Sequence, residues 1–166
     1  EECGVDAIVA EGFEAGGHNG REETTTMTLI PLIKKSITVP LIAAGGIGSG
    51  EAMLASMALG ANAVQVGSRF VATPEASSHH KFKEEVIKAE QGSTVLTLKE
   101  LKTVSLIKNQ FYEKIISLYE NGSSIEELRK ALGRGRAKRG MFEGDLVEGE
   151  LEIGQVSAQI DKIIPA

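Results

Sequence analysis

Three short apolar runs, each closed by glycine, constrain the fold of this chain more than any other feature. They are VDAIVAE at 5–11, VPLIAA at 39–44 and AVQV at 63–66, and glycines follow each of them. Short runs this apolar are typical of strands that are covered on both faces, as parallel strands are. About 30 and about 25 residues separate the runs, which leaves room for one helix in each interval. The pattern predicts repeated βα units.

The two intervals carry helix signals. Residues 24–36 have apolar side chains at helical spacing, with Thr24 or Thr25 as the cap. Pro31 is expected to kink this helix or to mark its first turn. In residues 49–59, Ser49 is the expected N-cap and Gly60 ends the helix. The order strand–helix–strand–helix–strand indicates an α/β fold, either a βα barrel or an open doubly wound sheet.

The pattern changes after Phe70, where charged amphipathic segments replace the alternation of strands and helices. Ser123 or Ser124 is a predicted cap, with Glu126 and Glu127 in the first turn of the helix that follows. We predict helices over 75–91, 107–121, 124–132 and 153–164, an extended segment at 94–98, and loops or short helices over 134–150.

Composition and charge exclude several classes of function. The chain has 166 residues and a net charge of −5, which argues against nucleic acid because a phosphate backbone attracts a basic surface. We interpret the basic run at 134–139 as solvated surface rather than a phosphate site. The single cysteine, Cys3, forms no disulfide and is predicted to be small apolar filling. With no apolar run of about 18 residues and no visible signal peptide, we expect a soluble, cytoplasmic protein without membrane contact.

The glycines at the second and third strand ends form a candidate phosphate site. Gly45, Gly46 and Gly67 present bare backbone amides, and Ser68 adds a hydroxyl. Ligands of parallel α/β proteins collect at the carboxyl ends of the strands, and amides in such turns bind anions. Turn geometry alone also explains glycine at such junctions. Because two consecutive strand ends share the feature, we favour a site that holds one phosphate.

Histidine lies among the glycines of the loop after the first strand, EAGGHNG. Histidine changes charge near neutral pH, so His18 is a candidate acid–base group beside the phosphate site. The alternative is a loop histidine that caps a turn. His79 and His80 are predicted to lie at a solvated helix start, and their spacing is not that of helical metal ligands. No metal constellation is apparent.

The segments AEGFEAGGHNG, TVPLIAAGGIGSG and GANAVQVGSRFVAT resemble the nitronate monooxygenase (2-nitropropane dioxygenase) family. The FMN-dependent type II enoyl-acyl-carrier-protein reductases are close relatives of that family. The resemblance implies a TIM-type (βα)8 barrel with FMN at its carboxyl rim. The family's phosphate-binding glycines fall on Gly45, Gly46 and Gly67 with Ser68. Its active-site histidine falls on His18, which would also contact substrate.

The resemblance implies that this chain supplies only the last three strands of the barrel and the C-terminal helices. Residues 1–75 would be the C-terminal βα units of the FMN-binding barrel, and residues 76–166 a helical region that packs on or caps it. Three strands cannot close a barrel, and the first residue is Glu1 rather than methionine. We therefore expect the missing N-terminal half from a longer chain or a separate piece, and no activity from this segment alone. A homodimer is the other expected assembly.

The resemblance leaves three functions open. The first is oxidation of alkyl nitronates with O2, with His18 as the base toward a nitroalkane or as the cation that holds nitronate oxygens. The second is reduction of an enoyl thioester on an acyl carrier protein, with NAD(P)H as co-substrate. The third belongs to another class, a phosphate-binding lyase or isomerase barrel without redox chemistry.

Overall fold

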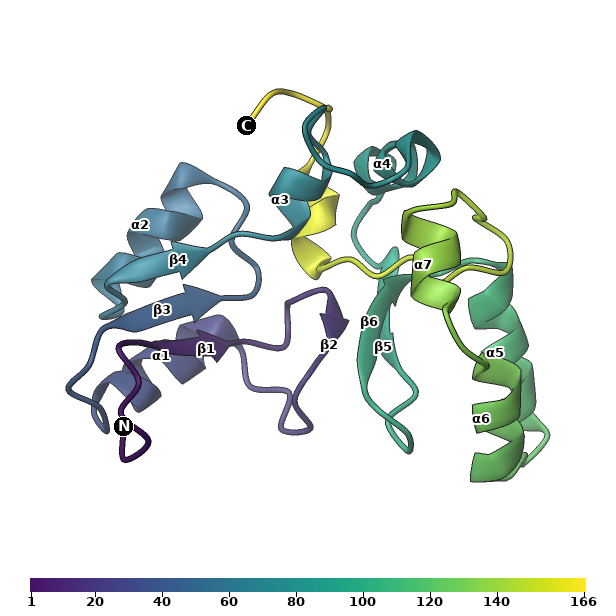
Figure 1. Ribbon diagram of the computed structural model, residues 1–166, viewed down its shortest axis with the longest axis horizontal. Helices are drawn as coiled ribbons and strands as arrows, with labels where there is room; N and C mark the ends of the chain where they lie inside the picture. Colours follow the sequence, from purple (N-terminus) through teal and green to yellow (C-terminus); the bar gives the residue numbers. More distant parts are fainter.

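Three parallel strands form the first sheet of the computed structural model, which describes residues 1–166 (Figure 1). They are β1 (Ile8–Glu11), β3 (Leu41–Ala44) and β4 (Ala63–Gln65), in the order β1-β3-β4. Ala43 is the central residue of the sheet, since it pairs with Ala10 on one side and with Val64 on the other. The three predicted parallel strands are confirmed, and the sheet is not closed.

Two helices cover the parallel sheet, α1 (Thr26–Lys34) and α2 (Gly50–Ala58). The predicted caps are confirmed: the side chain of Thr25 accepts a hydrogen bond from Thr28 N, and that of Ser49 accepts one from Ala52 N. Pro31 lies in the interior of α1, so the prediction that it marks the first turn is wrong. Apolar packing against the sheet holds the helix, because Ile30 is fully buried with Leu41 in the same core.

A second, antiparallel sheet was not predicted. It contains β2 (Gly17–His18), β5 (Thr94–Thr97) and β6 (Val104–Ile107), in the order β2-β6-β5. All residues of β6 are buried. The helix predicted over 107–121 therefore cannot begin at residue 107, which is the last residue of this strand. That helix, α5 (Gln110–Glu120), begins three residues later, where the Asn109 side chain accepts from Tyr112 N. Pairing with segments distant in sequence decides between strand and helix here.

The remaining helices are short. The segment predicted as a helix over 75–91 contains only α4 (His80–Ile87), capped by His79. His80 pairs with Glu84 at 3.0 Å on the exposed face, so the solvated helix start is confirmed. The capping box at Ser124 is also confirmed. The others are α3 (Ser68–Val71), α6 (Ile125–Leu132), α7 (Arg136–Met141) and the 3-10 helix η1 (Gln155–Gln159).

The C-terminal segment departs most from the prediction. A helix over 153–164 was expected, but only the five residues of η1 are helical. Ile153 N donates to Ser105 O, and Ile107 N donates to Leu151 O, so the segment before η1 pairs with β6 as an extended strand does. Figure 1 shows this segment crossing from α7, beside the antiparallel sheet, to η1 beneath α3.

One prediction about a single residue is wrong, and the prediction that the basic run is solvated surface holds for Arg134, Lys138 and Arg139 but not for Arg136. Cys3 is exposed, so it does not fill a core. Arg136, inside the basic run, is mostly buried: its guanidinium lies 4.4 Å from the Phe111 ring centroid and donates to the carbonyl oxygens of Leu132 and Ala131 at 2.6 and 2.8 Å. The basic run is therefore partly structural. None of the helices has both the length and the apolar character that crossing a membrane requires.

Candidate functional site

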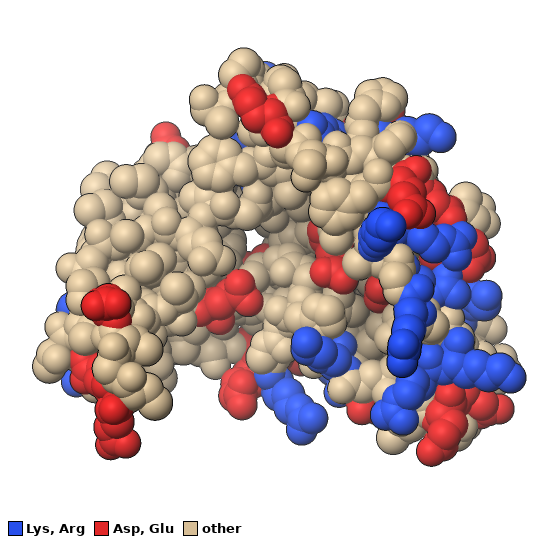
Figure 2. Space-filling view, in the orientation of Figure 1, with Lys and Arg blue, Asp and Glu red and all other residues tan.

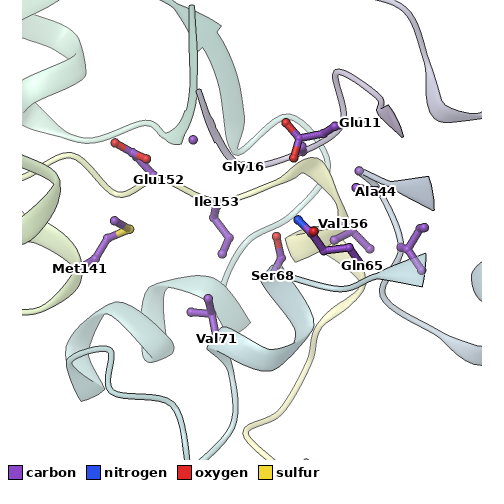
Figure 3. A pocket seen from close by; sticks show the side chains of 16 residues that line it. Glu11, Gly16, Ala44, Gln65, Ser68, Val71, Met141, Glu152, Ile153 and Val156 are labelled. Carbon is purple, nitrogen blue, oxygen red and sulfur yellow. The ribbon is translucent and has the colours of Figure 1, made fainter. Parts of the chain in front are cut away.

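A pocket of about 310 Å³ lies where the carboxyl ends of the three parallel strands meet the C-terminal segment (Figures 2 and 3). Gly45 and Gly46 after β3, and Gly67 and Ser68 after β4, all line it. The structure therefore brings together the four residues that the sequence predicted for a cofactor phosphate. Two neighbouring strand ends turn toward one hollow, as parallel strand order requires.

The backbone N–H groups at both strand ends have no acceptor within the chain. Those of Gly45, Gly46, Gly67 and Ser68 donate to no backbone or side-chain atom. None of these four residues is buried, so their unpaired donors are accessible and available to an anion in the pocket that the residues line. Because α3 has only four residues, its helix dipole adds little there, and the individual amides are the expected ligands of an anion.

The fold requires glycine at position 45 but not at position 67. Gly45 has φ +93°, and a β-carbon there would lie 2.5 Å from the carbonyl oxygen of Gly12. No protein atom lies within 4 Å of a β-carbon added to Gly67. Since Gly67 lines the pocket, its missing side chain leaves room for a ligand rather than for the protein. Both observations fit a phosphate held on bare backbone.

Ser68 is oriented by the C-terminal segment. Its Oγ accepts a hydrogen bond from Gly154 N at 3.0 Å, which leaves the hydroxyl proton free to donate. The loop that carries His18 is tied to the same segment, since Gln155 N donates to Glu14 O at 3.0 Å. The C-terminal segment thus forms part of the pocket and contacts both the Ser68 turn and the histidine loop.

Glu14 fastens the histidine loop to the start of α1. Thr26 N donates to both carboxylate oxygens, at 3.1 and 3.0 Å, and Thr26 Oγ1 donates to Gly45 O at 2.8 Å. The loop, the helix and the end of β3 are therefore linked by one set of hydrogen bonds. This arrangement fixes the backbone from which His18 projects.

His18 lies beside the pocket rather than in its lining. It is exposed and belongs to β2, where it pairs with Val104 of β6, and its neighbour Gly17 does line the pocket. The structure does not bring the imidazole into the same set of lining residues as the four phosphate candidates. Glu152, which lines the pocket, lies against Gly17, the residue before His18.

Three carboxyl groups in or beside the site were missed by sequence reasoning. Burial raises the pKa of Glu11 at the end of β1. Burial also raises the pKa of Glu152, while the nearby charges of His18 and Lys102 lower it. The pKa of Glu150 is raised to about 7 by burial and by Glu152, against the opposing effect of Arg136. Glu11 stood next to the first glycine and could have been found, whereas nothing local marked the other two.

The lining of the pocket is acidic. Glu11 and Glu152 are its charged residues, and it contains no lysine or arginine (Figure 3). An anion in this half of the site must therefore be held by amides and the Ser68 hydroxyl, without a cationic side chain. No group of three or more histidine, cysteine or acidic side chains is placed to hold a metal ion.

Comparison with known proteins agrees with this geometry. The nitronate monooxygenase family matches residues 1–166. Probable nitronate monooxygenases of Staphylococcus haemolyticus and Staphylococcus aureus strain Newman are 38% and 37% identical to the chain, over 68% and 72% of its length. These matches cover 34% and 36% of the relatives, so the chain spans about a third of their length.

Solved structures match almost the whole chain. FabK from Thermotoga maritima superposes with a TM-score of 0.90 at 40% identity, over 99% of this chain and 51% of that one. Nitroalkane oxidase from Streptomyces ansochromogenes superposes with a TM-score of 0.74 at 26% identity, over 99% and 49%. Both are TIM-barrel enzymes, and this chain corresponds to about half of each.

Proposed function

Because the chain belongs to the nitronate monooxygenase family, we propose that it supplies the FMN-binding half of a barrel oxidoreductase. The observation that carries the proposal is the set of unbonded N–H groups at two adjacent strand ends, all lining one pocket. The phosphate of FMN would lie on the amides of Gly45, Gly46 and Gly67 and accept the Ser68 hydroxyl proton. When bound, FMN supplies the redox chemistry of such enzymes.

His18 is the proposed acid–base residue. Its backbone is fixed by pairing with Val104, and it projects beside the pocket with Glu152 as its acidic neighbour. As a neutral imidazole, it would take a proton from the carbon of a nitroalkane. As a cation, it would hold the oxygen atoms of a nitronate. Either task requires the substrate to bind between His18 and the cofactor, at the open side of the pocket.

Two substrate classes have specific support. Oxidation of alkyl nitronates with O2 comes first, because the family match and the curated relatives both carry that name. Reduction of an enoyl thioester with NAD(P)H comes second, because FabK, an enoyl-acyl-carrier-protein reductase, superposes better and at higher identity than nitroalkane oxidase does.

The two activities can be separated on the full-length protein. We expect oxygen uptake with propyl nitronate if the first holds, and NADH oxidation with an enoyl thioester if the second holds. A flavin spectrum in the purified protein distinguishes both from a colourless lyase or isomerase. Replacement of His18 by Ala is expected to lower turnover by about 10²–10⁴-fold. Unchanged turnover with FMN still bound would remove His18 from the mechanism.

We further propose that residues outside this chain complete the barrel. The relatives are about two to three times as long, and both edges of the β1-β3-β4 sheet are open. Several large apolar side chains on this half are exposed, among them Val9, Met53 and Leu54. Figure 2 shows few charges over the parallel sheet and many over α5, α6 and α7. Open edges and exposed apolar side chains are what a sheet cut from a barrel presents.

Expression of residues 1–166 alone tests this proposal. We expect self-association and no retained flavin, because the exposed apolar side chains have no cover and half of the site is missing. A stable monomer that retains flavin would contradict it. The division into residues 1–75, carrying the FMN-binding βα units, and residues 76–166, packing on or capping the barrel, can be tested by expressing each part.

A further inference from the structure

His18 and Glu152 occupy successive same-face positions along one edge of β6. His18 pairs with Val104, and Glu152 forms a bridge with Leu106. Residues directly opposite each other share a face of a sheet, and so do residues two apart on one strand. Both side chains therefore lie on the same face, with their backbones about 7 Å apart along the strand direction, given a rise of about 3.4 Å per residue.

The backbone around Glu152 is held from both sides. On the β6 side, Ile107 N donates to Leu151 O at 2.9 Å, and Ile153 N donates to Ser105 O at 3.3 Å. On the other side, Gly154 N donates to Ser68 Oγ. The carboxylate lies against the residue before His18, since a β-carbon on Gly17 would come within 2.7 Å of Glu152 Oε2. Its place at the pocket wall is therefore a property of the fold (Figure 3).

The charged groups that face Glu152 come from three elements. They are His18 on β2, Lys102 just before β6, and Glu150 on the same segment, and Arg136 of α7 faces Glu150 in turn. Glu150 is only 8% exposed. Burial raises the pKa of Glu152, and the positive charges of His18 and Lys102 act against that rise.

We propose that Glu152 is a positioning residue that holds the imidazolium form of His18 beside the pocket. It acts through His18 and has no separate contact with the reacting atoms. Its part in turnover rests on the proposed function, whereas its electrostatic effect on His18 does not. Glu152 is distant from His18 in the sequence and reaches it through the pairing of both segments with β6.

Titration of the histidine ring by NMR tests the proposal without turnover. In the full-length protein with labelled histidine, the His18 signal is assigned by its loss in His18→Ala. We expect Glu152→Gln to move the His18 midpoint to lower pH by about 0.5–1 unit, because a nearby carboxylate favours the charged ring. Glu152→Asp keeps the charge and should keep most of the wild-type midpoint. The signals of His79 and His80 are internal references that should not move.

Glu120→Gln is the matched control, since it removes an exposed carboxylate at the end of α5 and should leave the His18 midpoint unchanged. An unchanged midpoint in a folded Glu152→Gln variant, or an equal shift in Glu120→Gln, would overturn the role of Glu152. If Glu152→Gln does not fold, a midpoint in Glu152→Asp above that of wild type would overturn it. Activity is a separate readout: lack of turnover in the wild type contradicts the proposed function and leaves the titration result intact.

Discussion

Replacement of Gly67 by Ala separates what the fold requires from what a ligand requires. Gly67 has φ −107° and ψ −75°, a right-handed conformation that alanine adopts. No protein atom lies within 4 Å of the added β-carbon. The folded protein therefore accommodates the methyl group, and alanine also reduces the conformational freedom of the unfolded chain. We expect the free energy of unfolding to rise by about 0.4–1 kcal/mol.

The same methyl group is expected to weaken FMN binding. Gly67 lines the pocket, and its amide is one of the proposed phosphate donors. Excess volume at a close-packed contact costs about 1–3 kcal/mol. That cost corresponds to an FMN dissociation constant about 5-fold to 150-fold higher. Stability and affinity should thus change in opposite directions.

The assay pairs urea unfolding of the apoprotein with FMN titration followed by flavin fluorescence, in the full-length protein. Gly50→Ala is the matched control: its β-carbon also meets nothing within 4 Å, and it lies in α2, outside the pocket lining. It should gain similar stability and keep wild-type affinity. A Gly67→Ala variant that binds FMN as tightly as wild type would refute the phosphate site, and a destabilised one would refute the steric reasoning.

Three further predictions concern stability. Burial raises the pKa of Glu150 to about 7 from an ordinary 4.5, so the folded state keeps a proton that the unfolded state releases, and stability falls as pH rises across that window. In urea unfolding, the free energy of unfolding of Glu150→Gln should therefore exceed that of wild type by about 3 kcal/mol near pH 8 and equal it near pH 4. Ser157→Ala removes a buried hydroxyl without a partner. It should raise the free energy of unfolding by about 1 kcal/mol, measured as a higher melting temperature. Arg136→Lys loses the planar stack on Phe111 and the fixed donors to two carbonyls. It should lower the free energy of unfolding in urea by about 2–4 kcal/mol.

Local rules were sufficient for the parallel half of the molecule. Apolar runs, caps such as Thr25 and Ser49, and glycine at strand ends are set by interactions within a few residues. They therefore predicted β1, β3 and β4 and their two helices. The phosphate candidates followed because parallel strands in sequence order must bring their carboxyl ends to one edge.

The antiparallel half needed the tertiary structure. No strand was predicted over residues 104–107, yet they form β6 because β2 and β5 pair with them on both sides. Residues 153 and 154 were predicted to start a helix, yet they are extended because β6 and Ser68 take their hydrogen bonds. In each case the deciding partner is distant in sequence, and local spacing carries no information about it.

The sequence on its own marked the candidate residues for binding a phosphate and for exchanging a proton. Only the folded molecule decided that the C-terminal segment reaches back to orient Ser68, and that Glu152 sits beside His18. The physical reason is the distance along the chain over which each property is set. Amides and an imidazole are properties of single residues, whereas the charge around them is set by whatever the fold packs nearby.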